Sequence, residues 1–113
     1  MGKPPKPPGD VMTSITIHFE VQAGAVASTS IAYTPVAGWT QAGGIYTSTE
    51  DIAAGETLGT AVVEPGNWAG AMTLAVTPAG SISMVGEGRT FTLSATADWP
   101  TGSNYSATLT ATP

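Results

Sequence analysis

The chain has 113 residues, of which 42% are hydrophobic and 10% are charged. This length provides one domain, and a domain of this size buries roughly 65% of the surface of its unfolded chain. The absence of cysteine excludes disulfides, a thiol nucleophile and a cysteine-based zinc site. No apolar run approaches the roughly 20 residues that span a bilayer, and prolines occupy the place of a signal peptide, so we expect a protein made in the cytoplasm that does not bind membranes.

The net charge of −5 is unevenly distributed along the chain. Lys3 and Lys6 lie near the N-terminus, and Arg89 is the only later lysine or arginine, against eight acids that begin at Asp10. Because nucleic-acid binding requires clustered basic residues, this composition predicts that nucleic acid is not a partner. A basic N-terminus and an acidic body favour binding to an identical neighbour, and a solvated, solubilising tail explains the same charges.

Residues 1–10 are rich in proline and contain two lysines. Proline fixes φ and lacks an N–H, so neither a helix nor a sheet ladder is expected there. A polyproline II arm reaches about 3.1 Å per residue, or roughly 25–30 Å, which is long enough to lie across an adjacent subunit. The predicted protein-binding residues of this extended arm are Lys3, Pro4, Pro5, Lys6, Pro7 and Pro8.

Residues 11–113 show the patterns of a single β-domain. Apolar and polar residues alternate over 13–22, with Ile15, Ile17 and Phe19 on one face, and this period of two predicts a half-buried strand. A weaker strand is expected over 25–34, a short strand over 43–48 and one helical turn over 50–55. Further strands are predicted at 58–64, 71–77, 81–85, 89–97 and 105–111.

Seven or eight short strands with turns every 8–12 residues predict an antiparallel sandwich or small barrel. The inward faces predicted for the last two strands are rich in alanine and contain Ala95, Ala97, Ala107 and Ala111. Alanine buries little apolar area, so we expect a marginally stable domain that gains from association.

Residues 82–97, ISMVGEGRTFTLSATA, resemble the V-G-x-G-x-T-x-x-L-x-A-T-A stretch of bacterial and phage immunoglobulin-like domains. Modules of that family decorate virion proteins and surface adhesins. The resemblance covers 16 of 113 residues and implies a single immunoglobulin-like β-sandwich, with no information about its partner.

The three tryptophans all lie beside glycine or proline in predicted turns. Such side chains stack on sugars, form hot spots of protein interfaces, or cover the ends of a core. Counting strands places Trp39 and Trp68 at one end of the sandwich and Trp99 at the other. Trp39 and Trp68 are therefore the candidate protein-binding residues of the domain.

Few residues suggest catalysis or metal binding. His18 lies two residues from Glu20 on a polar strand face. A carboxylate nearby would help His18 to act as a general base, but a polar face favours a solvated histidine without a catalytic role. Glu50, Asp51 and Asp98 are the candidate calcium ligands, but they do not form a repeated Asp/Asn loop. We predict no catalytic residue, no cofactor and no metal.

These patterns favour a non-enzymatic structural protein of a phage virion, assembled in the host cytoplasm. The most specific expectation is a capsid decoration or cement protein that binds the major capsid protein or other virion subunits and itself, as an oligomer or lattice component. A tail or fibre component fits most of the same features. Two different functions also fit: a carbohydrate-binding or adhesin module that uses Trp39 and Trp68, and a small hydrolase that uses His18 and an acid.

Overall fold

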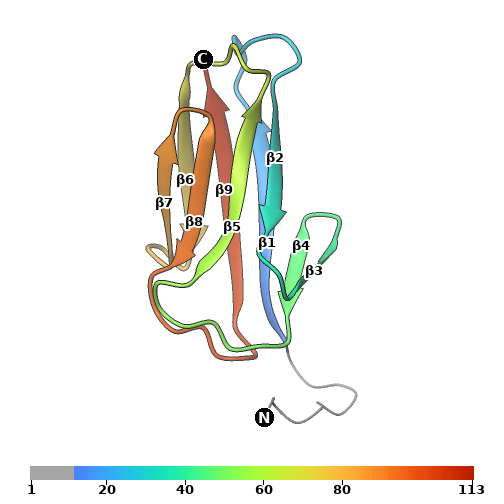
Figure 1. The fold of residues 1–113 in the computed structure, drawn as a ribbon, viewed down its shortest axis with the longest axis vertical. Helices are drawn as coiled ribbons and strands as arrows, with labels where there is room; N and C mark the ends of the chain where they lie inside the picture. The colour runs from blue at the N-terminus through green and yellow to red at the C-terminus, as the bar shows by residue number, and fades with distance from the viewer. Residues whose placement is uncertain (1–11) are drawn as a thin grey trace.

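The computed structural model describes residues 12–113, which form two β-sheets packed face to face (Figure 1). Within this range no helix is long and apolar enough to cross a membrane. The all-β prediction is confirmed. The strands in chain order are β1 (Thr13–Val21), β2 (Ser30–Pro35), β3 (Trp39–Ala42), β4 (Ile45–Ser48), β5 (Thr57–Glu64), β6 (Ala71–Thr77), β7 (Ile82–Glu87), β8 (Thr90–Ala95) and β9 (Asn104–Thr112).

One sheet has the strand order β3-β4-β1-β9-β6, and the other has the order β2-β5-β8-β7. The pairing of β1 with β9 is parallel, which differs from the expected all-antiparallel arrangement. In this central pair Ile17 lies beside Ala107 and Phe19 lies beside Leu109. The alanine thus leaves room for the larger neighbouring side chain.

One strand is not predicted, and one local prediction is wrong. The sequence patterns do not predict the strand β3, because its residues do not alternate between apolar and polar types. Residues 50–55 do not form a helical turn; instead Ile52 and Trp99 form an isolated bridge with N···O distances of 2.9 and 2.7 Å. The Ile52 side chain is only 3% exposed. Its burial in the core outweighs the weak helical tendency of so short a segment.

The core contains most of the predicted inward residues of the last two strands, including Leu93, Ala95 and Leu109. Ala97, which the strand pattern also predicts to face inward, lies beyond the end of β8 and is exposed. It also contains large side chains that the strand patterns do not place there, of which Trp99 and Trp68 come from turns. These rings add apolar area that the alanines lack. The predicted arm, residues 1–10, lies outside the described residues, as do its six candidate binding residues.

Candidate interaction surfaces

Two loops that are far apart in the sequence form the lower end of the sandwich in Figure 1, where β1 begins. We call this the β1 end and define it by residues 49–56 and 96–103. The Ile52–Trp99 bridge joins the two loops. The Asp98 carboxylate accepts a hydrogen bond from the N–H of Ala54 at 2.9 Å. The Asp51 carboxylate accepts one from the N–H of Thr101 at 2.8 Å. Each aspartate therefore braces the opposite loop.

A shallow pocket of about 360 Å³ lies between these loops. Its lining residues are Asp51, Ile52, Ala53, Asp98, Trp99 and Pro100. Trp99 is only 1% exposed, and its ring stacks on Tyr105 with centroids 3.8 Å apart and planes 15° apart. The pocket thus offers carboxylates and loop backbone, while the tryptophan face is already occupied.

The carboxylates of the β1 end do not form a metal centre. Among residues 12–113 no group of three or more His, Cys, Asp or Glu side chains is placed to hold a metal ion. The calcium ligands considered from the sequence, Glu50, Asp51 and Asp98, all lie in the loops of this end. The carboxylates of Asp51 and Asp98 accept hydrogen bonds from backbone N–H groups and so stabilise the loops.

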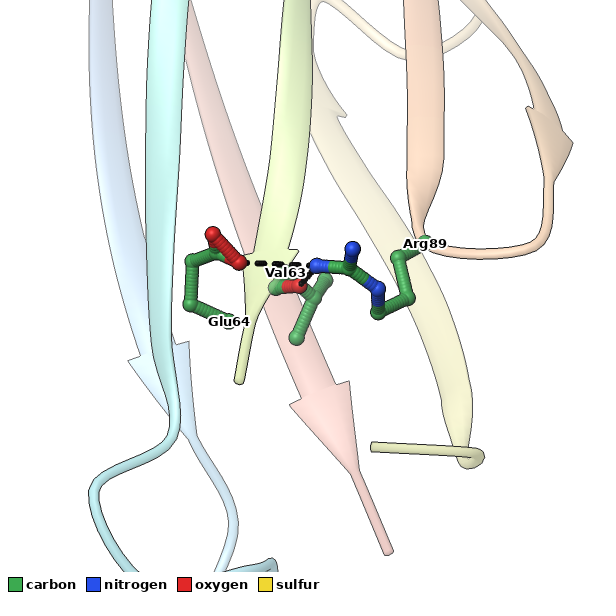
Figure 2. A network of polar contacts seen from close by, with 3 residues as sticks. All are labelled: Val63, Glu64 and Arg89. Carbon is green, nitrogen blue, oxygen red and sulfur yellow. Dashed lines mark hydrogen bonds and ion pairs between the residues drawn. The ribbon is translucent and has the colours of Figure 1, made fainter. Parts of the chain in front are cut away.

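Acidic side chains lie at both ends of the sandwich, with Glu64 and Glu87 near Arg89 and more acids at the β1 end. Four acids belong to the loops of the β1 end: Glu50, Asp51, Glu56 and Asp98. Arg89, which is the only lysine or arginine in the described range, lies at the opposite end. Its Nη1 atom donates to the Glu64 carboxylate at 2.7 Å and to the Val63 carbonyl oxygen at 2.7 Å, as the dashed lines in Figure 2 mark. The one described arginine is therefore separated from the acids of the β1 end by the length of the sandwich.

The prediction that Trp39 and Trp68 share one end of the sandwich is wrong. Trp39 is aligned with Ser48 of β4, which is aligned with Thr13 of β1, so Trp39 lies at the β1 end with Trp99. The unpredicted strand β3 adds one reversal of the chain, and Trp68 consequently lies at the opposite end.

The two candidate tryptophans also differ in burial. Trp68 is 4% exposed and packs edge-on against Phe91, with ring centroids 6.3 Å apart, so its ring belongs to the core and not to the surface. Trp39 is half-buried at the edge of the core. Of these two, only Trp39 is partly exposed to solvent.

The single histidine lies on an open surface. The Nε2 atom of His18 is 3.4 Å from the Glu20 carboxylate, and the two side chains are 66% and 49% exposed. On the neighbouring strand His18 lies beside Thr108. This setting matches the interpretation of a solvated strand histidine and provides no enclosed cleft for acid–base chemistry.

The outward sheet faces carry small, uncharged side chains. In the five-stranded sheet, Thr16, Ser106 and Thr77 form one row across three strands, and all three are exposed. In the other sheet, Thr34, Thr60, Thr92 and Val85 form a row, and Val85 is 72% exposed. These small side chains are the threonine and serine residues that alternate with apolar residues along the strands.

The sequence patterns do not reveal the pocket or the bracing of the two loops. The hydrogen-bonded residues of the two loops lie 44 and 50 positions apart in the chain, and no local pattern joins them. No protein-family model, curated protein or solved structure matches this chain.

Proposed function

We propose that this chain is a non-enzymatic structural protein of a phage virion, a capsid decoration or cement protein that stabilises the shell by binding neighbouring subunits. The observation that carries the proposal is the division of charge. Four of the seven acids among residues 12–113 lie in the loops of the β1 end, and the one arginine of this range is paired with Glu64, so the described domain is acidic overall. The two lysines lie in the proline-rich residues 1–10. One copy thus carries a basic segment and an acidic domain, which are complementary in charge.

In this role the arm of one subunit extends over the acidic body of the next. Proline restricts the unbound arm, so less conformational entropy is lost when the arm is ordered. The attraction between Lys3 or Lys6 and a carboxylate at the surface is screened beyond about 8 Å at physiological salt. Binding through the arm should therefore weaken as the salt concentration rises.

The domain supports such a role through its shape and its surface. Both outward sheet faces are rich in threonine, serine and alanine, so another subunit can approach without burying many charges. Trp39, which is half-buried at the β1 end, offers an aromatic anchor beside the carboxylates. We propose Trp39 as the domain residue that contacts the shell or a neighbouring copy.

The first experiment tests whether the chain belongs to a particle. Virus-sized particles are purified by density-gradient centrifugation from cells that produce this chain, and quantitative mass spectrometry counts its copies against the major shell protein. We expect a fixed stoichiometric ratio. Absence of the chain from purified particles contradicts the proposal, and cryo-electron microscopy separates a position on the shell from a position on a tail or fibre.

The second experiment tests the arm. The double substitution Lys3→Glu with Lys6→Glu should weaken binding at least tenfold to particles on which neighbouring sites already carry the original chain, because it replaces attraction to the acidic body of the neighbour by repulsion. The matched control, Lys3→Arg with Lys6→Arg, keeps the charge and should bind as the original chain does. Equal binding of the two variants would show that the charge of the arm is not used.

A carbohydrate-binding function also has an observation in its favour. The pocket at the β1 end, with two carboxylates, and the half-buried Trp39 lie at the same end of the sandwich, which places polar groups and an aromatic side chain at one end. A glycan array with the original chain and a Trp39→Ala variant tests it. Glycan binding that Trp39→Ala abolishes, in a chain absent from particles, would favour the carbohydrate-binding or adhesin module.

A further inference from the structure

We propose that two copies of this chain pair through the outer edge of β6, Ala71–Thr77, in an antiparallel arrangement centred on Leu74. The inference deepens the proposed function, on which its biological meaning rests, by naming a second copy as one partner of the assembling subunit. Its test uses the purified chain in solution. The outcome can therefore be separated from the outcome of the particle experiments.

Within the described residues β6 pairs with a strand on one side only. It is the last strand of the five-stranded sheet and is hydrogen-bonded to β9, and it lies on the left side of the sandwich in Figure 1. The Thr112 hydroxyl donates to the Ala71 carbonyl, and this contact also comes from the β9 side. The other edge of β6 is available to a further strand.

β6 lacks the features that protect sheet edges from pairing. Natural edge strands avoid pairing by being short or by carrying charges, prolines or bulges. Among the remaining edge strands described, β3 has four residues, β2 ends at Pro35, and β7 contains Gly86 and Glu87. β6 has seven residues and contains no charge, proline or glycine.

The sequence of β6 is self-complementary about its central residue. Met72, Leu74 and Val76 face the core side, and the residues between them are exposed on the outer side. In an antiparallel pair centred on Leu74, Leu74 lies opposite its own copy and Met72 lies opposite Val76 of the second copy. Every directly opposed pair then joins two residues of the same face.

With Leu74 at the centre, all seven residues of β6 are paired with residues of the second copy. Directly opposed residues point to the same side of a sheet, so a shift by one residue would turn the two cores to opposite sides. On the outer side, Thr73 lies opposite Ala75 of the second copy, and Ala71 lies opposite Thr77. No charged side chain is buried or brought near another within the paired strands.

The same symmetry favours a second copy over an unrelated strand. A two-fold interface uses one patch twice and closes after two subunits, so it forms a discrete dimer and not a fibre. It joins two five-stranded sheets into one continuous sheet and covers the partly buried Leu74 and Val76 at the edge of the core. Because backbone hydrogen bonds and apolar contacts hold this pair, it should resist salt, unlike binding through the lysines of the arm.

Cysteine crosslinking tests both the strand and the register, because the chain has no cysteine of its own. Directly opposed residues have Cα atoms about 4.5–5.5 Å apart, which suits a disulfide, whereas diagonal neighbours lie about 7–8 Å apart. We expect a mixture of the Thr73→Cys and Ala75→Cys variants to form at least five times more oxidised dimer than either variant alone.

The matched control is Ala32→Cys, an exposed position on the edge strand β2. It should form little dimer. Strong crosslinking of Ala32→Cys, or equal crosslinking of the mixture and of each single variant, overturns the proposal.

Sedimentation velocity provides a second measurement. The Thr73→Lys, Ala75→Lys double variant places charges on exposed positions of β6, so the dilute monomer should keep its melting temperature while the dissociation constant of the dimer rises at least tenfold. Ala32→Lys should leave the dissociation constant unchanged. A chain that is monomeric at all concentrations but binds particles overturns the β6 pairing and leaves the proposed function standing, and a dimer absent from particles does the reverse.

Discussion

At the scale of single residues, two tyrosines illustrate how the space between the sheets is filled. Tyr33 of β2 packs edge-on against Tyr46 of β4, with ring centroids 4.9 Å apart and planes 78° apart. Burial raises the pKa of the Tyr33 hydroxyl, and the negative charge of an ionised Tyr46 would raise it further. Burial also raises the pKa of Tyr46. Both hydroxyls therefore stay neutral in the folded protein when free tyrosine would ionise.

This pair predicts a loss of stability in alkali. An unfolded tyrosine has a pKa of about 10, and the folded pKa values lie above it. The contribution of the neutral, buried phenols is thus fully present below about pH 10 and is lost as the pH rises beyond that value, because the unfolded chain releases the protons first. The urea midpoint should fall between pH 9.5 and 11, roughly, and the fall should be smaller in Tyr33→Phe. An equal fall in both proteins would contradict the assignment.

Gly59 of β5 is required by the ring above it. A Cβ at this position would lie 2.3 Å from the Tyr33 hydroxyl oxygen and 2.7 Å from the Thr34 carbonyl oxygen. We expect Gly59→Ala to lower the free energy of unfolding by about 1–3 kcal/mol, as overpacking of a core does. Tyr33→Phe in that background should restore only part of the loss, because the ring carbon Cζ, 2.4 Å from the added Cβ, and the Thr34 carbonyl oxygen both remain in the way.

The control for Gly59→Ala is Thr57→Ala, an exposed position of the same strand, which should change stability by at most about 0.5 kcal/mol. Urea unfolding measures all four proteins. A Gly59→Ala variant as stable as Thr57→Ala would show that the Tyr33 ring and the strand move aside without lowering the free energy of unfolding.

At the scale of elements, the β1 end is held by hydrogen bonds between loops and not by a sheet ladder. The bridge between Ile52 and Trp99 is one residue long on each side. The carboxylates of Asp51 and Asp98 extend it by binding N–H groups of the opposite loop. Because Trp99 belongs to one of these loops, their position also determines how the core is closed.

Substitutions of Asp98 test this bracing. Asp98→Ala removes the acceptor of the Ala54 N–H and should cost about 1 kcal/mol of stability, while Asp98→Asn keeps a side-chain oxygen and should retain most of it. Hydrogen exchange of the Ala54 amide, followed by NMR, should accelerate in the alanine variant and change little in the asparagine variant. Unchanged Ala54 exchange in Asp98→Ala would show that the bond does not hold the loop.

At the scale of the whole molecule, the core is fuller than the alanine-rich strands suggest. Trp68 and Trp99 fill it from the turns, while Ala95, Ala107 and Ala111 remain its small members. Self-association through β6 would still add stability by mass action. The gain is about 2.7 kcal/mol when the partner concentration is 100 times the dissociation constant.

The melting temperature should therefore rise with protein concentration. We expect scanning calorimetry over a hundredfold concentration range to show this rise for the original chain and not for the Thr73→Lys, Ala75→Lys variant. A constant melting temperature in the original chain would contradict self-association.

The strands whose side chains alternate could be predicted from the sequence, because a period of two is a local property that one buried face imposes. β1 and β9 were predictable in this way, as was the division of charge that places Lys3 and Lys6 apart from the acids. The short β3, with four mostly exposed residues, shows no such pattern, and counting strands without it places the tryptophans at the wrong ends.

The features that depend on residues far apart in the chain could not be predicted from the sequence. The parallel pairing of β1 with β9, the bridge between Ile52 and Trp99, and the exposed edge of β6 all follow from which strands become neighbours. Neighbour choice depends on how all the apolar faces can be buried together. For the same reason residues 50–55, which have helical signals, form an irregular loop in which Ile52 is buried in the core.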